Sequence, residues 1–256
     1  MRSSDQRRNA RIASRSVQVA FLLILIVLWF LATTRWRVSP LLLPNPVLVL
    51  RDFWESLRTG EFLGDLRVTL TELAFAFLIS ASSGVVVGYL ISRSQYRIRV
   101  FEPLFAGIYA VPIILFLPLY VLFFGLGPAS KIALGATISF FPIALSTIAG
   151  FGHVEKVLVT AARAMGASEY QLFRFVLLPA ALPVILTGLR MGFTVALLAI
   201  IGSETLASLA GLGHRIVHLA ESMEMAPMFA YIAFVVAIAA ILNTLVSALE
   251  ARGKRP

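Results

Sequence analysis

Long apolar segments separated by short polar ones dominate this 256-residue chain. A membrane-spanning helix needs about 20 predominantly apolar residues, and six segments come close to that length. They cover residues 17–34, 66–91, 103–126, 130–151, 182–207 and 227–249. We therefore predict an all-α membrane protein with six transmembrane helices, a class that the mean hydropathy of +0.90 also favours.

The composition supports this class and excludes others. Hydrophobic residues make up 59% of the chain and charged residues 14%, which is more apolar surface than a soluble domain of this size can bury. The absence of cysteine excludes disulfides and thiol nucleophiles. The net charge of +9 does not indicate nucleic-acid binding, because the basic residues lie between and beside the apolar segments. There they contact the lipid bilayer and set the topology.

The distribution of Lys and Arg predicts the orientation. With the N-terminus in the cytoplasm, 15 of the 22 basic residues fall inside and 7 outside, as the positive-inside rule requires. Residues 1–16 and 251–256 are then basic cytoplasmic tails on a transmembrane domain of residues 17–250. The first apolar segment also fits a signal peptide in part, but it is long and lacks a convincing cleavage site. We expect an uncleaved first helix.

Prolines, glycines and periodicity predict the connections between spans. Pro112 and Pro118 inside the third segment predict a bent helix. Residues 125–128, Gly-Leu-Gly-Pro, predict a turn before the fourth segment. Residues 47–59 place their apolar side chains on one helical face. That face fits an amphipathic helix on the outer membrane surface or, equally, one packed on the bundle.

A polar insert, residues 155–179, separates the fourth and fifth segments. Gly166 and Ser168 predict a hinge between two short helices, with Gly166 just after the first helix and Ser168 as N-cap of the second. Gln171 completes a capping box with Ser168. Three apolar side chains are expected to anchor the second helix to the membrane domain: Leu172, Phe173 and Val176. The small residues Ala161, Ala162 and Gly166 would let another protein approach the backbone closely.

The pattern Ala161-Ala162-x3-Gly166-x9-Val176-x-Leu178-Pro179 resembles the EAA signature of bacterial ABC-importer permeases, with Thr160 where that family usually has Glu. Similarity to the nitrate/sulfonate/taurine/bicarbonate group of these permeases extends over residues 40–250. It is carried by Leu178–Arg190, Leu43–Pro46, Thr69–Glu72, Gly202–Glu204 and Gly211–Gly213. The resemblance implies the six-helix architecture of a type I, MetI-like importer permease.

The resemblance also implies partners. They are ATP-binding-cassette ATPase subunits, a periplasmic or lipoprotein substrate-binding protein, and a second permease copy forming a homodimer in the bacterial cytoplasmic membrane; a paralogous second subunit is the alternative. The ATPase would dock on the insert through Thr160, Ala161, Ala162, Arg163, Met165, Gly166, Ala167, Ser168, Leu178 and Pro179. The outer loop 208–225 would help to receive the binding protein through Gly211, Gly213 and His214. ATP and Mg would be held by the partner ATPase, with no cofactor on this chain.

Carboxylates inside predicted spans are costly and usually face a bundle interior or water. Glu72 and Glu204 are therefore candidates for the translocation pathway, together with Met191 and Thr194; alternatively, the two glutamates are structural and hydrogen-bonded to neighbouring helices. His214 and His218 lie one helical turn apart, but the sequence specifies no further ligand. We predict no metal site and no catalytic residue. Arg190 is expected to reach the cytoplasmic headgroups.

The resemblance thus implies an importer permease that moves a small organic or inorganic anion, such as a sulfonate, nitrate or bicarbonate, by alternating access. No phosphate-binding loop matches G-x-x-x-x-G-K-[ST], so a separate subunit would hydrolyse ATP. Relatives of the resembled group also import thiamine-pyrimidine precursors or aromatic acids. An ion-coupled secondary transporter would need coupling-ion residues and usually an internal repeat, and a membrane enzyme would need clustered His, Asp or Glu.

Overall fold

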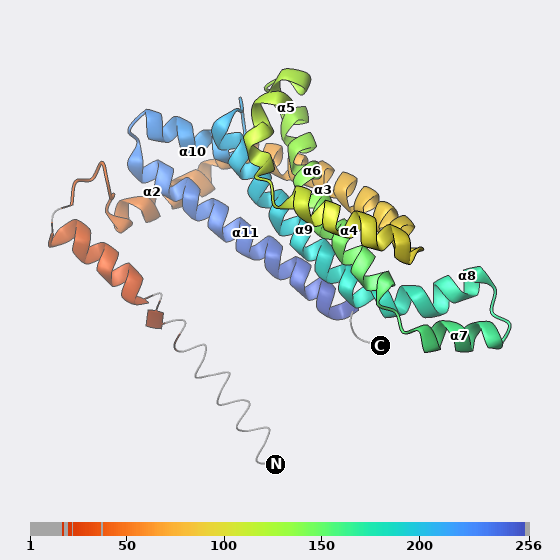
Figure 1. The fold of residues 1–256 in the computed structure, drawn as a ribbon. Coiled ribbons are helices and arrows are strands. Elements are labelled where there is room, and N and C mark those ends of the chain that lie inside the picture. The colour runs from red at the N-terminus through yellow and green to blue at the C-terminus, as the bar shows by residue number, and fades with distance from the viewer. Residues whose placement is uncertain (1–16, 18–19, 22, 37, 254–256) are drawn as a thin grey trace, which may run out of the picture. The chain divides into compact units, whose positions relative to one another are not determined.

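The computed structural model describes residues 17, 20, 21, 23–36 and 38–253 (Figure 1). Among them every regular element is a helix, in the order α2 (Pro46–Thr59), α3 (Phe62–Ser92), α4 (Gln95–Tyr109), η1 (Ile113–Phe116), α5 (Leu117–Phe124), α6 (Pro128–Gly152), α7 (Lys156–Ala164), α8 (Glu169–Leu172), η2 (Phe173–Leu177), α9 (Leu178–Leu206), α10 (Leu212–Glu221) and α11 (Met225–Gly253). A further apolar helix covers Leu23–Thr34. The all-α prediction is confirmed for this part of the chain.

Within the described residues, four helices are long and apolar enough to cross a membrane: α3, α6, the continuous Glu169–Leu206 helix and α11. The helices α4 and α5, with η1 between them, add a fifth span if the bent pair counts as one. Leu23–Thr34 is shorter, and part of the span expected over residues 17–34 lies outside the described residues, as does the expected tail 1–16. Among the described residues the structure therefore supports four or five spans, and the predicted number of six is not confirmed.

The third expected span differs most from its prediction. The chain is already helical from Gln95, breaks after Tyr109 and resumes at Ile113, with 72° between the two parts. Pro112 lies in the break with ψ 81, outside the helical region, whereas Pro118 lies in the first turn of α5, where a missing N–H is tolerated. The predicted bend is present, but it lies at Pro112 alone.

The turn before α6 matches its prediction, whereas the loop after α9 and the end of α11 differ from theirs. The turn before α6 has Gly125 at φ 78, a conformation that favours glycine, and Pro128 starts the next helix. Residues 208–225, expected to form an outer loop, are mostly helical, because α10 covers Leu212–Glu221. At the other end of the chain, α11 is helical to Gly253, beyond the expected boundary at residue 250.

The described chain divides into two compact units. Unit 1 holds the described residues up to Glu61 together with Ile216–Phe234. Unit 2 holds Phe62–Arg215 and the described residues from Val235 onwards. Residues 156–172, α9 and both side-chain clusters described below belong to unit 2.

Unit 1 contains the predicted amphipathic helix as α2. Asn45 caps it by accepting a 2.9 Å hydrogen bond from the Val47 N–H, and Pro46 occupies its first turn. Phe53 stacks on Phe234 of α11, with ring centroids 4.1 Å apart. The helix is confirmed, and this contact shows that its apolar face is partly covered by protein.

Unit 2 is built around α6, which packs against both α3 and α9 (Figure 1). Small residues bring the three helices close together, as is common where helices associate in a membrane. A Cβ atom on Gly88 of α3 would lie 2.7 Å from the carbonyl oxygen of Ala144, and one on Gly192 of α9 would lie 3.2 Å from that of Ser139. Larger residues at these places would push the helices apart. Each end of this three-helix bundle carries one of the candidate sites.

Candidate functional site

The polar insert forms a helical hairpin, residues 156–172, made of α7, a tight turn and α8 (Figure 1). The turn follows the Schellman pattern: Ala167 donates its N–H to Ala162 O (3.1 Å) and Gly166 donates to Arg163 O (3.0 Å). Gly166 has φ 82, a left-handed conformation that a residue with a Cβ adopts only at a cost. The predicted position of Gly166 just beyond the first helix is confirmed.

Ser168 and Gln171 start the second helix of the hairpin as predicted. The Gln171 N–H donates to Ser168 Oγ (3.3 Å), and the Ser168 N–H donates to Gln171 Oε1 (2.8 Å), which completes the capping box. Arg163 of α7 also pairs with Glu169 of α8 at 3.1 Å, although both side chains are largely exposed. The sequence therefore specifies the turn geometry locally, through side chains and backbone groups that lie within a few residues of one another.

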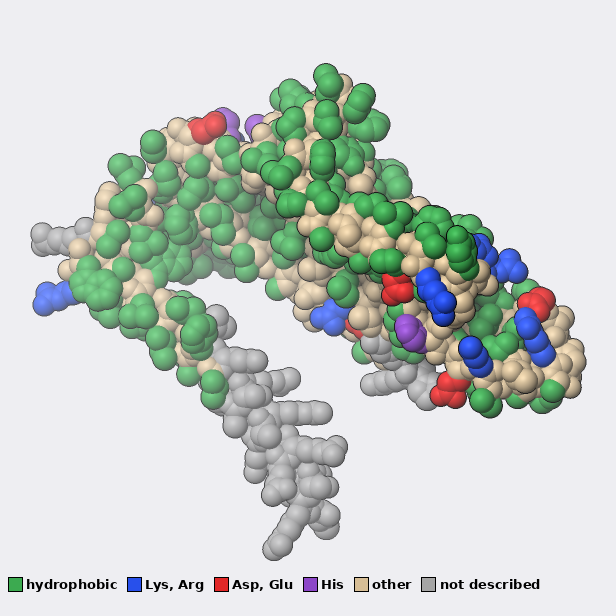
Figure 2. All heavy atoms as spheres, viewed as in Figure 1, with side chains coloured by type: hydrophobic (Ala, Val, Ile, Leu, Met, Phe, Trp, Pro, Cys, Tyr) green, Lys and Arg blue, Asp and Glu red, His purple; other side chains and the backbone are tan. Residues whose placement is uncertain are grey.

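The hairpin has two different faces. Ala162 (4% exposed) and Leu172 (2% exposed) are buried on one side of the hairpin. Val157, Met165 and Tyr170 are 74%, 82% and 72% exposed. Charged side chains gather at the α7–α8 end of the molecule, whereas α5 shows mainly hydrophobic ones (Figure 2). The outer face therefore presents apolar side chains on a polar, water-accessible segment, which is typical of a protein contact.

The small residues of the predicted docking surface differ in exposure. Ala162 is buried, whereas Ala161 and Gly166 are exposed. Thr160, which stands where the resembled signature has Glu, is exposed and donates its hydroxyl to Lys156 O within its own helix (2.9 Å). Arg163, Ala167 and Ser168 lie in or beside the turn described above.

The second arm of the hairpin continues without interruption into the membrane. The helix runs from Glu169 to Leu206 and contains one π-helical turn, η2, at Phe173–Leu177. Pro179 lies two residues after η2 and has no N–H to donate to the carbonyl four residues before it. A change from α-helical to π-helical hydrogen bonds just before the proline is consistent with this missing donor. Within η2 the Leu178 N–H reaches back to Phe173 O. Leu178 is half-buried, and Pro179 is exposed.

An aromatic cluster, Tyr89, Phe151 and Phe173, joins this helix to the end of the bundle. The Phe173 ring centroid lies 5.2 Å from that of Tyr89 at the end of α3 and 6.1 Å from that of Phe151 at the end of α6. Tyr89 and Phe151 are themselves in edge contact at 5.0 Å. The predicted anchoring role of Phe173 is confirmed, while Leu172 is buried and Val176 is half-buried.

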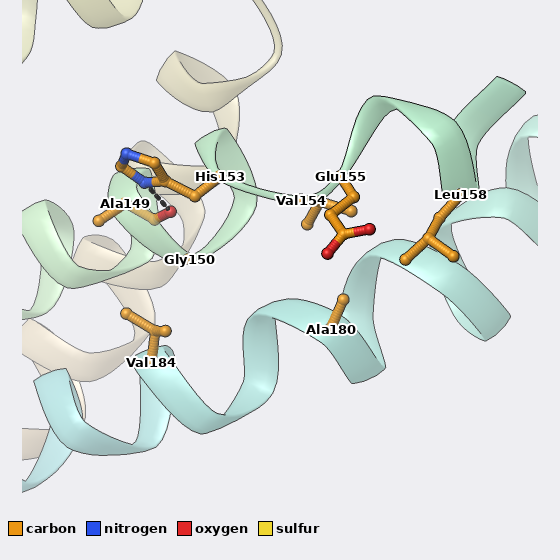
Figure 3. Close-up of a pocket in the computed structure, with 8 residues that line it drawn as sticks. All are labelled: Ala149, Gly150, His153, Val154, Glu155, Leu158, Ala180 and Val184. Carbon is orange, nitrogen blue, oxygen red and sulfur yellow. Dashed lines mark hydrogen bonds between the residues drawn. The ribbon is translucent and has the colours of Figure 1, made fainter.

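Beside the hairpin lies a cavity of about 370 Å³ between the end of α6, the start of α7 and α9 (Figure 3). It is lined by Ala149, Gly150, His153, Val154, Glu155, Leu158, Ala180 and Val184. His153 Nδ1 is bonded to Ala149 O at 2.8 Å, and Glu155 is the one carboxylate among these lining residues. The cavity leaves open space on the inner side of α7, where the hairpin meets the bundle.

A buried charged cluster lies at the opposite end of the bundle, where α3 and α6 begin and α9 ends. Its members are Thr69, Glu72, Lys131 and Glu204, none more than 2% exposed. Glu204 Oε1 accepts a 2.7 Å hydrogen bond from Thr69 Oγ1. Lys131 donates to the carbonyl oxygens of Leu126 and Gly127, in the turn before α6. In this structure Glu72 and Glu204 face the interior of the bundle rather than an open path.

The same cluster holds the start of α10. Glu204 Oε2 accepts a 2.8 Å hydrogen bond from the Gly213 N–H, and Thr69 Oγ1 accepts a 3.0 Å bond from the Leu212 N–H. These are backbone donors that a helix N-terminus leaves without internal partners. Gly211 and Gly213 are buried, because their backbones pack directly on Glu204. Their geometry in this chain therefore reflects packing, while His214 is half-buried.

The remaining pathway candidates lie on α9. Met191 is exposed and shares a stripe at seven-residue spacing with Val184 and Leu198, both also exposed. Thr194 is half-buried and donates to Arg190 O within its own helix (3.1 Å). The stripe is apolar and is left uncovered by the rest of unit 2.

The sequence suggested no structural role for three polar residues that have one in the fold: Thr69, Lys131 and Glu250. Lys131 is the second residue of the predicted span 130–151. Glu250 of α11 accepts hydrogen bonds from Thr187 (3.0 Å) and Arg190 (3.2 Å) of α9. The expectation that Arg190 extends to the headgroups is thus replaced by an ion pair between two helices.

Comparison with known proteins agrees with this architecture. Residues 81–255 match the family model of the binding-protein-dependent transport system inner membrane component. The taurine transport system permease protein TauC of Escherichia coli (strain K12) is 33% identical over 93% of this chain and 88% of its own length. The putative aliphatic sulfonates transport permease protein SsuC of Bacillus subtilis (strain 168) is 30% identical over 89% and 82%. A crystal structure of an amino acid ABC transporter with histidines has a TM-score of 0.62 at 22% identity, over 79% and 97%.

These findings define a multi-pass, all-helical membrane protein with the fold of an ABC-importer permease. The chain belongs to the family of binding-protein-dependent transport system inner membrane components. Within that family it matches the sulfonate and taurine permeases, as the sequence motifs predicted.

Proposed function

We propose that this chain is the permease subunit of an ABC importer and that separate ATPase subunits drive it by docking on the hairpin, residues 156–172. The observation that carries the proposal is the two-sided hairpin itself. Ala162 and Leu172 are buried on its inner face, and Phe173, directly after it, packs on Tyr89 and Phe151 of the bundle, while Met165, Val157 and Tyr170 are exposed on the outer face. A rigidly anchored segment with exposed apolar side chains suits a partner that must exert force on it.

The path from the hairpin into the membrane supports this role. The second arm is continuous with α9, so a displacement of the hairpin moves the same helix that ends at the charged cluster. The aromatic cluster adds contacts from Phe173 to α3 and α6. ATP-driven closure of the partner subunits would thus favour one of two arrangements of the helices, which is how alternating access couples to a remote reaction.

The docking role is tested by a charge placed on the exposed face. Met165→Glu should insert and fold normally, because the side chain is 82% exposed, but it should lose co-purification with the ATPase. Met223→Glu is the matched control, since Met223 is also largely exposed and is not part of hairpin residues 156–172. Gly166→Trp gives a second test, because no atom lies within 4 Å of a Cβ at that position and the ring would project into the partner's space. Equal ATPase recovery for all variants would exclude hairpin docking.

We further propose that a second copy of the chain covers the stripe Val184, Met191 and Leu198 and that the translocation path lies between the two copies. The chain contains no cysteine, so a single introduced cysteine reports one position cleanly. Met191→Cys should form a disulfide-linked dimer in membranes under mild oxidation. Leu78→Cys on α3, also exposed, should stay monomeric. Equal cross-linking at both positions would contradict the placement of the interface.

The proposed cargo is a small sulfonate, in keeping with the taurine and aliphatic sulfonate permeases to which the chain is similar. A substrate-binding protein would deliver it from outside the cytoplasmic membrane, with both chain termini in the cytoplasm. Cells that lack their own sulfonate importers and express this chain with its ATPase and binding protein should accumulate labelled taurine or an alkanesulfonate. Uptake of nitrate or bicarbonate instead would redirect the assignment within the same class of importer.

A further inference from the structure

The charged cluster contains three ionisable side chains in a nearly dry place. Glu72 and Glu204 are each 1% exposed, and Lys131 is 0% exposed. Both glutamates interact electrostatically with each other and with Lys131. If all three were charged, the site would hold two negative charges against one positive charge, and buried charge without a counterpart is strongly unfavourable.

Glu204 has the surroundings of an ionised carboxylate. Its Oε1 accepts from Thr69 Oγ1 at 2.7 Å, and its Oε2 accepts from the Gly213 N–H at 2.8 Å. Hydrogen bonds donated to both oxygens favour the charged form of a carboxyl group. The start of α10 adds the positive end of a helix dipole, which favours a negative charge there as well.

Glu72 has the opposite surroundings. No donor from the described residues reaches its Oε2, although the atom is buried. Lys131 donates its hydrogen bonds to the carbonyls of Leu126 and Gly127, and it forms no ion pair with a described carboxylate. The ammonium group therefore balances one negative charge in the cluster from a distance without satisfying the Glu72 oxygen.

The two carboxyl groups also lie within hydrogen-bonding reach of each other. Two ionised carboxylates have only acceptor oxygens and cannot form such a bond. A protonated carboxyl group supplies the missing donor, and it also reduces the charge of the cluster to zero. Asp65, at the start of α3, is the other acidic group that acts on Glu204, and it is half-buried rather than enclosed.

We propose that Glu72, Glu204 and Lys131 form a charge-neutral site that binds one proton, carried by Glu72 and shared with Glu204. The ligand of this site is the proton itself, and its role is to let α3, α6, α9 and the start of α10 meet through polar groups without an unbalanced charge. The proposal stands apart from transport, because it needs neither the ATPase nor the cargo.

The test is infrared spectroscopy of the purified full chain, labelled with carboxyl-¹³C glutamate, at neutral pH in a detergent without ester groups. The wild type should show a band from a protonated glutamate. Glu72→Gln should remove the band, because the remaining Glu204 and Lys131 already balance. Glu204→Gln should also remove it, since Glu72 can then ionise against Lys131. Lys131→Met should enlarge it, because both carboxyl groups would then be protonated.

Glu250→Gln is the matched control. Glu250 is similarly buried, at 8% exposed, but its oxygens accept from Thr187 and Arg190, so its removal should leave the band unchanged. If Lys131→Met does not fold, the double variant Glu72→Gln/Lys131→Met should still show the band, from Glu204. A wild type without the band, or a band that survives Glu72→Gln or Glu204→Gln, would overturn the proposal.

Discussion

The Glu204 carboxylate accepts a 2.8 Å hydrogen bond from the Gly213 backbone N–H, which ties the end of α9 to the start of α10. Thr69 of α3 strengthens the tie, because it donates to Glu204 and accepts from Leu212. Residues 211–213, Gly-Leu-Gly, thus form one structural unit with Glu204, which lies seven to nine residues before them in the chain. The glycines at 211 and 213 let this backbone pack directly on the Glu204 side chain.

The tie predicts that Gly213→Ala destabilises the protein. A Cβ at this position would lie 2.5 Å from the Ile201 carbonyl oxygen and 2.7 Å from Glu204 Cβ, so the loop or α9 must shift. We expect a loss of about 1–3 kcal/mol, the usual cost of overpacking. Thermal unfolding in detergent measures it. Gly202→Ala is the control, because nothing lies within 4 Å of a Cβ there, and its unfolding midpoint should not fall.

The aromatic cluster predicts separate effects on binding and on transport. Phe173→Ala removes contacts to Tyr89 and Phe151, at a cost below the roughly 3–5 kcal/mol of a fully buried Phe→Ala substitution. The ATPase should still co-purify, because the exposed face of the hairpin is intact, but ATP-driven uptake should drop sharply. Phe175→Ala, at an exposed neighbouring position, should change stability by no more than about 0.5 kcal/mol. Normal uptake by Phe173→Ala would argue against force transmission through the cluster.

The capping box predicts local loosening in Ser168→Ala. The substitution removes the acceptor of the Gln171 N–H and should cost about 1 kcal/mol at the start of α8. Amide hydrogen exchange should accelerate around residues 169–172 and stay unchanged in α9. Ser168→Asp keeps an acceptor at the same position and should behave like the wild type. Unchanged exchange in Ser168→Ala would show that tertiary contacts alone hold α8.

The two ion pairs predict unequal consequences. Glu250→Gln weakens a pair whose carboxylate side chain is 10% exposed and should lower stability by about 1–2 kcal/mol. Glu169→Gln disrupts a pair whose side chains are 60% and 77% exposed, and such surface pairs contribute little. Chemical denaturation of both variants makes the comparison. A larger loss for Glu169→Gln would mean that the hairpin depends on its surface charges.

The sequence predicted well those features that depend on neighbouring residues. Gly166 and Ser168 specify the hairpin turn through bonds that span three to five residues, and the apolar segments specify four of the spans directly. The sequence predicted a bend in the third span from Pro112 and Pro118, but not that only Pro112 lies in the break, where the two helical parts meet at 72°. Whether a proline bends a helix or starts a new one depends on what surrounds it, and Pro112 and Pro118 illustrate both outcomes.

By itself, the sequence determined the helical class, the membrane location, the hairpin and the family, because apolar length, caps and short motifs are local properties. The tertiary structure alone decided that Thr69, Glu72, Lys131 and Glu204 meet, that Ala162 is buried and that Glu250 pairs with Arg190. These partners lie far apart along the chain, and in a membrane the cost of an unpaired charge makes their meeting specific. Only the packing of α3, α6 and α9 shows which of them share a site.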